Sequence, residues 1–256
     1  MINERPQVEL IVGGLHHDMN AVRLHLLTLL DEYELARVGC HSDFGNGSAL
    51  ADADFLITYT NNVIPEGAAL KALEGFLDRG GRWLAIHGAA ALTCFQPPPV
   101  DIGGISLPGL TDTPDLAPEY MALLGVRFVS HLTQQPIVVR RGPAAHPVTE
   151  GLMPFEIVDE PYILELRGEG DVLLESRYTG EAPGYVAGPW LDDEPRPQLV
   201  HHRHGAGEVM YLAPGHACGR YDLRPFIDEV PEQPGPWADE AYIGLIRRLI
   251  AWGMRC

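Results

Sequence analysis

The stretch Gly80-Gly81-Arg82-Trp83-Leu84-Ala85-Ile86-His87-Gly88-Ala89 decides the fold class. It predicts a buried strand, Trp83 to Ile86, that stops at a polar residue followed by Gly, and the small residues Ala89 to Leu92 then predict a helix. Strand, tight turn and helix in that order form the elbow on which α/β enzymes mount a reactive side chain. Such an elbow usually carries Ser or Cys, whereas this one carries His87. Nucleophile chemistry in its common form is therefore not expected here.

The chain before this elbow alternates between strand and helix patterns. Asp18 is the expected N-cap of the first helix, and Gly80-Gly81 ends the second, which begins at Pro65. Short connections between alternating elements predict a parallel sheet covered on both faces, with its sites at the carboxyl ends of the strands. The predicted elements are a strand at Val8–Gly13, a helix at Asp18–Leu30, a weaker strand at Tyr33–Val38, a strand at Phe55–Tyr59 and a helix at Pro65–Arg79.

The second half of the chain has a different character. Gln96–Pro118 is rich in Pro and Gly, which excludes a regular helix or a central strand, and it predicts either a lid loop or a plain surface excursion. No linker or repeat divides the chain, so residues 1–256 are expected to form a single domain. The remaining predicted elements are a helix at Pro118–Leu124, strands at Ile137–Arg140, Tyr162–Leu166 and Val172–Tyr178, a β-hairpin of Pro197–His202 with Glu208–Ala213, and a helix at Pro236–Trp252.

Composition excludes several classes of function. The 256 residues carry a formal net charge of −17, and their Lys and Arg form no cluster, so no nucleic-acid partner is expected. No apolar run approaches the length of a membrane span, and Met1–Pro6 lacks the pattern of a secretion signal, so the expected location is the cytoplasm with no membrane contact. Cys40, Cys94, Cys218 and Cys256 are widely spaced and are expected to be reduced there.

Four histidines and one acidic pair stand at the ends of predicted strands. They are His17, His87, His131, His216 and Asp159-Glu160. If those ends converge, imidazoles with a carboxylate can hold a divalent metal such as Zn²⁺, or the same groups can act as acid and base without a metal. The spacing is long-range throughout and does not decide between the two.

We expect His87 to be the central acid, base or metal ligand, with Glu160 as its carboxylate partner. Asp159 and His216 complete the predicted catalytic set, while His17, Asp18, His131 and Tyr162 are the predicted substrate-binding residues. Asp18 has an alternative role as a helix cap, and each histidine taken alone is more often a structural residue. A metal, where present, is expected on His87, His131, His216 and Glu160; otherwise no cofactor is expected.

Six motifs in order resemble the ThuA-like family, named for trehalose utilisation. They lie at residues 14–18, 80–89, 124–131, 146–152, 158–162 and 205–216. The resemblance implies a class I glutamine amidotransferase-like fold, which is a flavodoxin-like three-layer sandwich with a mostly parallel central sheet, here with β-hairpin additions in the second half. It also implies that His87 replaces the amidotransferase Cys, so glutaminase activity is not expected. Cys94, seven residues later, cannot take that place.

The family setting implies sugar or glycoside metabolism, including that of keto-sugars. Gln96–Pro114 is longer than is usual in the family, and Pro161 follows Asp159-Glu160 where another residue is common. We therefore expect an enzyme that acts on a small carbohydrate-like ligand. The alternatives are a non-catalytic sugar-binding or scaffold protein, and a subunit that acts with an oxidoreductase partner. A homo-oligomer is compatible with each of these.

Overall fold

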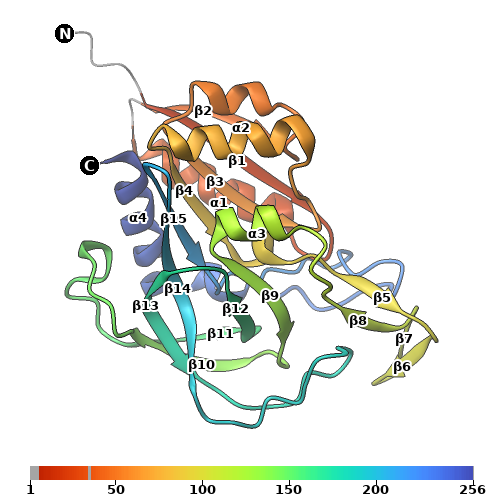
Figure 1. Cartoon of the computed structure of the whole chain (residues 1–256). Helices are drawn as coiled ribbons and strands as arrows, with labels where there is room; N and C mark the ends of the chain where they lie inside the picture. Colours follow the sequence, from red (N-terminus) through yellow and green to blue (C-terminus); the bar gives the residue numbers. More distant parts are fainter. Residues whose placement is uncertain (1–5, 34–35, 256) are drawn as a thin grey trace, which may run out of the picture.

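A computed structural model describes residues 6–33 and 36–255. Most of Met1–Pro6, part of the predicted strand Tyr33–Val38, and Cys256 lie outside the described residues. The principal sheet has nine strands among the residues described (Figure 1). In order across the sheet they are β11 (Phe155–Asp159), β10 (Gln135–Arg141), β13 (Gly170–Arg177), β14 (Pro195–His204), β15 (Gly207–Leu212), β4 (Arg82–Ile86), β3 (Phe55–Asn61), β1 (Gln7–Gly14) and β2 (Arg37–His41).

The sheet is mixed, so the predicted mostly parallel flavodoxin-like sheet is wrong. β15, β4, β3, β1 and β2 pair in parallel, whereas β14, β13, β10 and β11 continue the sheet through antiparallel pairings. The physical reason lies in the connections. Parallel neighbours need a crossover of a dozen or more residues, usually a helix, whereas short turns such as the one between β14 and β15 return the chain antiparallel. Helices separate the strands of the first half, but no α-helix lies between β9 (Val126–His131) and β15.

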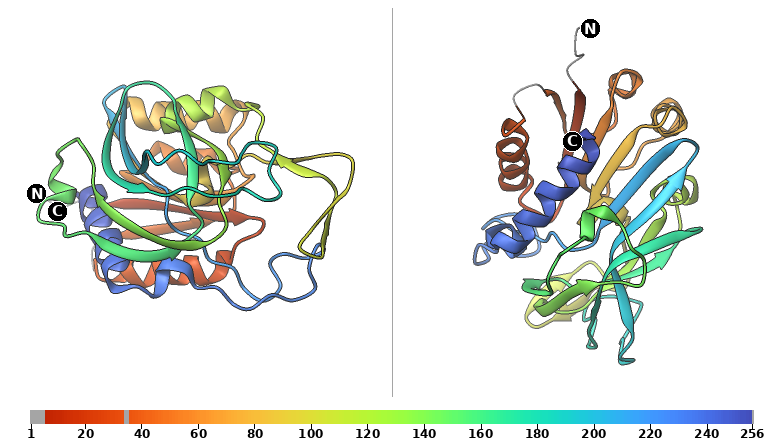
Figure 2. Two further views of the ribbon diagram at one scale, coloured as in Figure 1. Left: turned by 90° about the horizontal axis from the view of Figure 1, so that it is seen from below. Right: turned by 90° about the vertical axis from the view of Figure 1, so that its left-hand side faces the viewer.

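Two pairs of helices cover the faces of the parallel part of the sheet (Figures 1 and 2). α1 (Met19–Asp31) and α4 (Glu240–Met254) pack on one face, and α2 (Gly67–Asp78) and α3 (Pro118–Leu124) pack on the other. Neighbouring residues of β1 show the alternation, because Leu10 belongs to the core with α1 and α4 and Ile11 to the core with α2 and α3. Asp18 caps α1 as predicted, accepting a hydrogen bond from Ala21 N at 2.9 Å.

The chain after β4 departs from the predicted elbow. Instead of a helix over Ala89–Leu92, His87–Ala90 form a single 3₁₀ turn, and the chain then enters β5 (Cys94–Gln96). Four small residues cannot nucleate a helix against the strand-forming Thr93-Cys94-Phe95 and the prolines that follow. Gly88 permits the tight turn, because a Cβ there would lie 2.5 Å from the Thr60 carbonyl oxygen.

The Pro- and Gly-rich segment folds into two small antiparallel ladders. β5 pairs with β8 (Leu110–Asp112), and β6 (Val100–Ile102) pairs with β7 (Ile105–Leu107). They project from one end of the molecule (Figure 1). A third pair, β9 with β12 (Tyr162–Leu166), lies beside the principal sheet. The remaining short helices are 3₁₀ turns at Gly47–Ala51, Pro147–Thr149 and Gly235–Ala238.

The predicted β-hairpin is confirmed by the pairing of β14 with β15. Trp237, Tyr242 and Trp252 are at most 8% exposed and pack in the core around α4. The described part of the chain contains no helix with the length and hydrophobicity of a membrane span.

Candidate functional site

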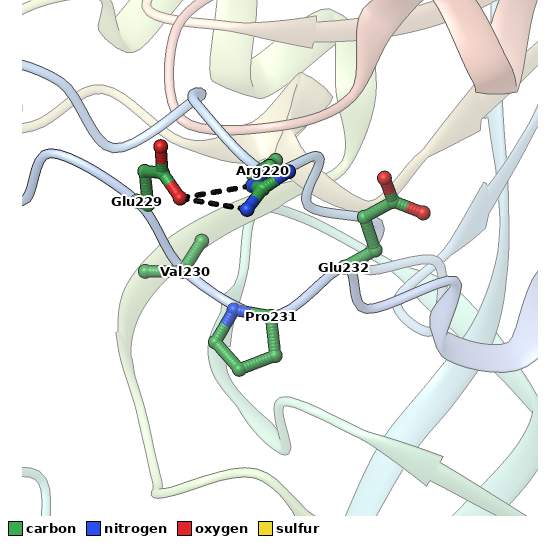
Figure 3. Close-up of a pocket in the computed structure, with 5 residues that line it drawn as sticks. All are labelled: Arg220, Glu229, Val230, Pro231 and Glu232. Atoms are coloured by element: carbon green, nitrogen blue, oxygen red, sulfur yellow. Dashed lines mark hydrogen bonds and ion pairs between the residues drawn. The ribbon is translucent and has the colours of Figure 1, made fainter.

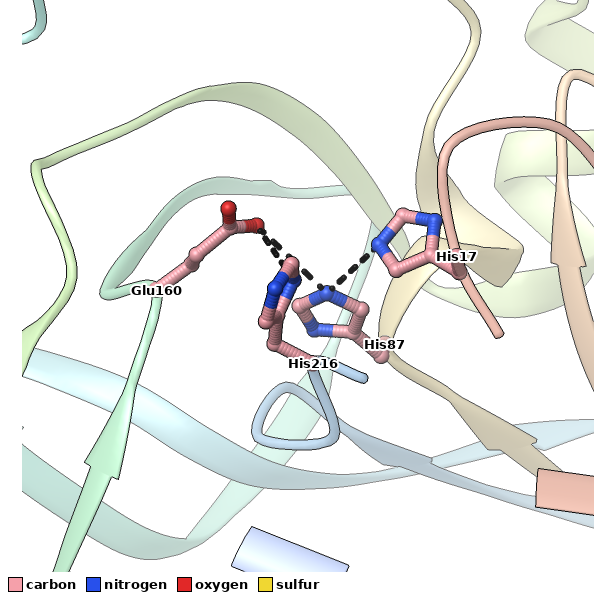
Figure 4. A group of neighbouring side chains, drawn as sticks. All are labelled: His17, His87, Glu160 and His216. Atoms are coloured by element: carbon pink, nitrogen blue, oxygen red, sulfur yellow. Dashed lines mark hydrogen bonds and ion pairs between the residues drawn. The ribbon is translucent and has the colours of Figure 1, made fainter. Parts of the chain in front are cut away.

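The carboxyl ends of the parallel strands bring three of the predicted histidines together. His17 follows β1, His87 follows β4, and His216 follows β15. Glu160 reaches them from the turn between β11 and β12, in the antiparallel part of the chain (Figure 4). One ligand atom from each of these four residues can be chosen so that all four atoms lie within 4.8 Å of one another. We call these four residues, His17, His87, Glu160 and His216, the histidine centre.

His87 lies at the middle of the histidine centre and is fully buried. Its backbone has φ 50°, an uncommon conformation for a residue other than Gly, and the Tyr211 hydroxyl donates to its carbonyl oxygen at 2.8 Å. Its Nδ1 lies 2.8 Å from the Ala213 carbonyl oxygen, which assigns the proton to Nδ1 and the lone pair to Nε2. The Tyr162 hydroxyl donates to that Nε2 at 2.9 Å, and the two rings stack.

His17 lies beside His87 and has the same tautomer, with its proton on Nδ1. Its Nδ1 lies 3.1 Å from the Leu15 carbonyl oxygen, so its Nε2 also carries a lone pair. The two Nε2 atoms lie 3.1 Å apart (Figure 4). Burial, and secondly the charge of His216, lower the pKa of His17 to about 4, while burial followed by the effect of His17 holds the pKa of His87 well below its usual range. Two neutral acceptors therefore face each other.

His216 completes the histidine centre from the loop after β15. Its Nε2 lies 3.1 Å from Gln233 Oε1, which leaves Nδ1 directed at Glu160 Oε2 at 3.1 Å. That contact is close enough for an ion pair, but the atoms are not aligned for a hydrogen bond. Burial lowers the pKa of His216, and the Glu160 carboxylate more than offsets this, raising it to about 9. Burial would raise the pKa of Glu160, but His131 and His216 together hold it well below its usual value.

Asp159 lies behind the histidine centre and does not line the pocket. It is fully buried, and its carboxyl oxygens accept hydrogen bonds from the backbone N–H groups of Glu160 (2.7 Å), Gly215 (2.7 Å) and His216 (3.1 Å). Burial raises the pKa of Asp159 to about 7. Asp159 thus fastens the Glu160 turn to the loop that carries His216, which makes it a positioning residue.

The other predicted residues occupy different places. His131 lies at the edge of the histidine centre, with Nε2 3.8 Å from Glu160 Oε2 and Nδ1 2.9 Å from the Leu132 carbonyl oxygen. It is outside the group of four, and it lines the pocket together with His17. Tyr162 lines the pocket. Asp18 does not line this pocket, because its carboxylate caps α1.

A pocket of about 600 Å³ opens above the histidine centre. His17, His131, Glu160 and His216 lie at its base, and the Pro- and Gly-rich segment contributes its outer wall. Ile102, Ile105 and Leu107 of the segment Gln96–Pro118 line this pocket. A separate depression on the loop after β15 is shallow, and its Arg220 pairs with Glu229 at 2.9 Å (Figure 3).

Asn61 is a pocket residue that sequence reasoning missed. It lines the pocket at the carboxyl end of β3, and its buried Oδ1 has no hydrogen-bond partner. A buried acceptor without a partner costs free energy, which a ligand hydroxyl or a water can recover. The sequence signal was present, because Asn61 follows a strand that belongs to the same parallel series as those before His17 and His87.

A second group of potential metal ligands consists of His146, His201 and Glu208. Protein groups already serve as the hydrogen-bond partners of these three side chains. His201 Nε2 lies 3.0 Å from Glu208, and Arg82 lies 3.3 Å from the same carboxylate. His146 Nδ1 accepts the Val148 N–H at 3.2 Å as the cap of a 3₁₀ turn. Glu208 is paired with Arg82, and His146 serves as a helix cap. We therefore interpret this group as an ion-pair network and not as a set of metal ligands.

A family model described as trehalose utilisation, ThuA, matches residues 12–229. The fold is similar to that of a ThuA-like protein from Bacteroides uniformis, with a TM-score of 0.64, 17% identity, and coverage of 99% of this chain and 93% of that one. A ThuA-like protein from Parabacteroides merdae gives a TM-score of 0.62 at 15% identity, covering 97% and 90%. No curated protein matches the chain.

A larger protein contains the same fold as one part. In a cold-adapted β-galactosidase from Rahnella sp. R3, the similarity covers 98% of this chain but 31% of that chain, with a TM-score of 0.57 and 16% identity. At such identities the likeness to solved structures shows the fold alone.

Proposed function

The chain belongs to the ThuA family, and from this premise we propose that it is an enzyme of carbohydrate metabolism whose histidine centre holds a divalent metal ion such as Zn²⁺. One observation carries the proposal. The Nε2 atoms of His17 and His87 lie 3.1 Å apart while the Nδ1 atom of each faces a backbone carbonyl oxygen. No neutral tautomer of His17 satisfies both of its nitrogens, because a proton moved to Nε2 leaves Nδ1 facing the Leu15 oxygen. A cation between the two Nε2 atoms removes the conflict.

The separations suit a small tetrahedral ion. Ligand bonds of about 2.0–2.1 Å to tetrahedral zinc put neighbouring ligand atoms roughly 3.3 Å apart. The separations are 3.1 Å from His17 Nε2 to His87 Nε2, 3.1 Å from His216 Nδ1 to Glu160 Oε2 and 3.9 Å from His87 Nε2 to Glu160 Oε2. All four ligand atoms lie within 4.8 Å of one another, so a bound ion would have to draw the more distant pairs together. Three imidazoles and one carboxylate are a donor set that favours Zn²⁺ over Mg²⁺ or Ca²⁺.

The surroundings of the ligands also support the proposal. Metal-bound histidines almost always donate their second ring N–H to an oxygen, which fixes the tautomer and the ring orientation. The three histidines have such oxygens at Leu15, Ala213 and Gln233. The proposed set differs from the set expected from sequence, since His17 replaces His131.

A bound ion would supply Lewis-acid polarisation of a substrate oxygen. His131 faces the pocket with Nε2 free of a backbone partner, and it is placed to accept a substrate proton. Burial raises the pKa of Tyr162 well above its usual range, so its hydroxyl stays a donor. Asn61, Thr93 and Gln134 offer neutral hydrogen-bonding groups to substrate hydroxyls.

The rival interpretation is a sugar-binding or scaffold protein on the same fold. A scaffold has no need to gather its histidines, whereas a catalytic or metal site needs several ring nitrogens near a common point. Convergence within 4.8 Å of ligand atoms from three strand ends and one distant turn favours the enzyme.

The test is the metal content of protein purified without an affinity tag or added metal. We expect about one zinc or similar divalent ion per chain in the wild type and less than a tenth of that in His87→Ala and His87→Gln. The second variant keeps the side chain larger in case the alanine variant fails to fold. The matched control is His201→Gln, a similarly buried histidine in the ion-pair network, which should retain the metal. Metal-free wild-type protein that also fails to bind added Zn²⁺ would falsify the proposal.

A further inference from the structure

The pocket above the histidine centre is polar at its base and apolar at its outer wall. The base carries the imidazoles and Glu160, whereas the β6–β7 ladder contributes Ile102, Ile105 and Leu107 to the wall. These three side chains are only partly buried, so apolar surface faces the pocket. Apolar surface held against water costs free energy that a ligand of matching polarity recovers on binding.

The loop after His216 forms the opposite side of the same wall. Leu223, Phe226 and Ile227 line the pocket from this loop. The two sides meet where Phe95 and Phe226 contact edge to face, with ring centroids 5.2 Å apart. The apolar wall is therefore continuous across two segments that are more than a hundred residues apart in the chain.

No Lys or Arg lies among the described residues that line the pocket, and its histidines lie at the base beside Glu160. A phosphate or carboxylate at the outer wall would have no Lys or Arg to pair with, and binding such a group there would leave its charge unpaired. The ligand portion that lies against this wall is therefore neutral as well as apolar.

We propose that the substrate is a neutral glycoside that carries an apolar aglycone of about the size of an aryl ring. The sugar lies over the histidine centre, and the aglycone lies against Ile102, Leu107 and Phe226. The placement of the sugar rests on the proposed function, but the aglycone site rests on the wall alone. A volume of about 600 Å³ accommodates both parts, whereas a monosaccharide would leave the outer half in contact with water.

Calorimetric titration of matched glycosides tests the proposal. The probes are the phenyl and methyl glycosides of glucose and galactose, in both anomers, titrated into the full chain with and without equimolar Zn²⁺. We expect at least one phenyl glycoside to bind about tenfold or more tightly than its methyl partner, because burying a ring removes apolar area from water. In the double variant Ile102→Ser/Leu107→Ser, the ratio of phenyl-glycoside to methyl-glycoside affinity should fall to a value between about one and three.

The matched control is Leu191→Ser, an aliphatic residue that is 65% exposed and does not line the pocket, which should keep the wild-type ratio. Equal affinity for phenyl and methyl partners overturns the inference, and so does the absence of phenyl-glycoside binding at 10 mM. A phenyl preference that depends on Ile102 and Leu107 in protein that binds no metal leaves the aglycone site standing and removes the proposed metal centre. Metal binding without a phenyl preference leaves the proposed metal centre standing and removes the aglycone site.

Discussion

The Nε2 atoms of His17 and His87 lie 3.1 Å apart, although each ring is fixed on its other side by a backbone carbonyl oxygen and the Tyr162 hydroxyl lies 2.9 Å from the His87 Nε2. Buried polar atoms are almost always paired with a hydrogen-bond partner, and two acceptors in contact repel each other. The repulsion is lowest when a cation lies between them. The predictions below follow from this contact and from the groups that hold it in place.

Removal of the metal should destabilise the protein. Dialysis against a chelator is expected to lower the melting temperature, and equimolar Zn²⁺ should restore it, because a ligand that binds the folded state stabilises it by several kcal/mol when its concentration far exceeds its Kd (about 4 kcal/mol at a thousandfold excess). Differential scanning calorimetry measures the shift. His216→Ala should show no zinc-dependent shift, and a full-sized shift in that variant would contradict the assigned ligands.

His131→Ala should keep its metal. Its Nε2 lies near Glu160 but outside the four-atom group, so its loss removes no ligand. The expected metal content is that of the wild type, with any activity found on a glycoside reduced by about 10²–10⁴-fold, as for a general acid or base. His17→Ala is the matched comparison and should lose the ion. The opposite pattern, with metal lost from His131→Ala and kept by His17→Ala, would restore the ligand set expected from sequence.

Asp159→Asn should loosen both the fold and the histidine centre. An amide keeps one acceptor oxygen but places an NH₂ donor against a backbone N–H, so we expect a loss of about 2–3 kcal/mol in the free energy of unfolding measured with urea. Zinc affinity should fall as well, because Asp159 holds the backbone of Glu160 and His216. Asp43→Asn is the control, since that exposed side chain accepts a bond from Gly45 and should change stability by no more than about 0.5 kcal/mol.

Gly88→Ala should destabilise the elbow by about 3 kcal/mol, because its Cβ would meet the Thr60 carbonyl oxygen at 2.5 Å and neither backbone can move freely. Gly75→Ala is the matched control within α2, where a Cβ meets only the end of the Arg79 side chain at 3.8 Å. That control should be neutral or more stable by up to about 1 kcal/mol. Urea unfolding of both variants decides the matter, and equal effects would show that the close approach at Gly88 is unimportant.

The ion-pair network predicts a pH dependence away from the histidine centre. Burial raises the pKa of Glu208, but Arg82 and His201 outweigh it and leave the pKa below its usual value. A carboxyl group whose pKa is lowered on folding stabilises the folded state above its unfolded pKa, and this contribution is lost as the pH falls through the folded value. Glu208→Gln should thus cost about 1 kcal/mol at pH 7.

The stability difference between wild type and Glu208→Gln should shrink steadily as the pH falls below about 5. Urea unfolding across that range measures it. A difference that persists at pH 3 would show that the side chain acts through packing instead of charge. The metal content of Glu208→Gln should match the wild type throughout.

The sequence predicted those parts of the fold that depend on local pattern. The strands before His17, His87 and His216 were recognisable, but whether their ends converge was left open, and the parallel pairing of β15, β4, β3 and β1 brings them together. Two features depended on the whole chain. Whether later strands join in parallel or antiparallel is decided by the length of their connections, and Glu160 reaches the histidine centre only because β11 and β12 fold back beside it.

The elbow shows a second limit of local pattern. Ala89–Leu92 favour a helix by propensity, yet a helix needs more than one turn to repay its nucleation, and the chain turns away into β5. Asn61 was missed for a related reason, since the expected strand ended at Tyr59 and the observed β3 extends to Asn61.

Asp159 joins the turn before β12 to the loop after β15, and the histidine centre spans the same two regions and the first strand. A chain synthesised from its N-terminus presents His17 and His87 long before His216, so the full set of four ligands exists only after residue 216 has been added. Once captured, the ion would act as a cross-link that closes a loop from residue 17 to residue 216, most of the chain. Because its ligands come from both the parallel and the antiparallel parts, the ion would couple the unfolding of the two parts into one cooperative transition.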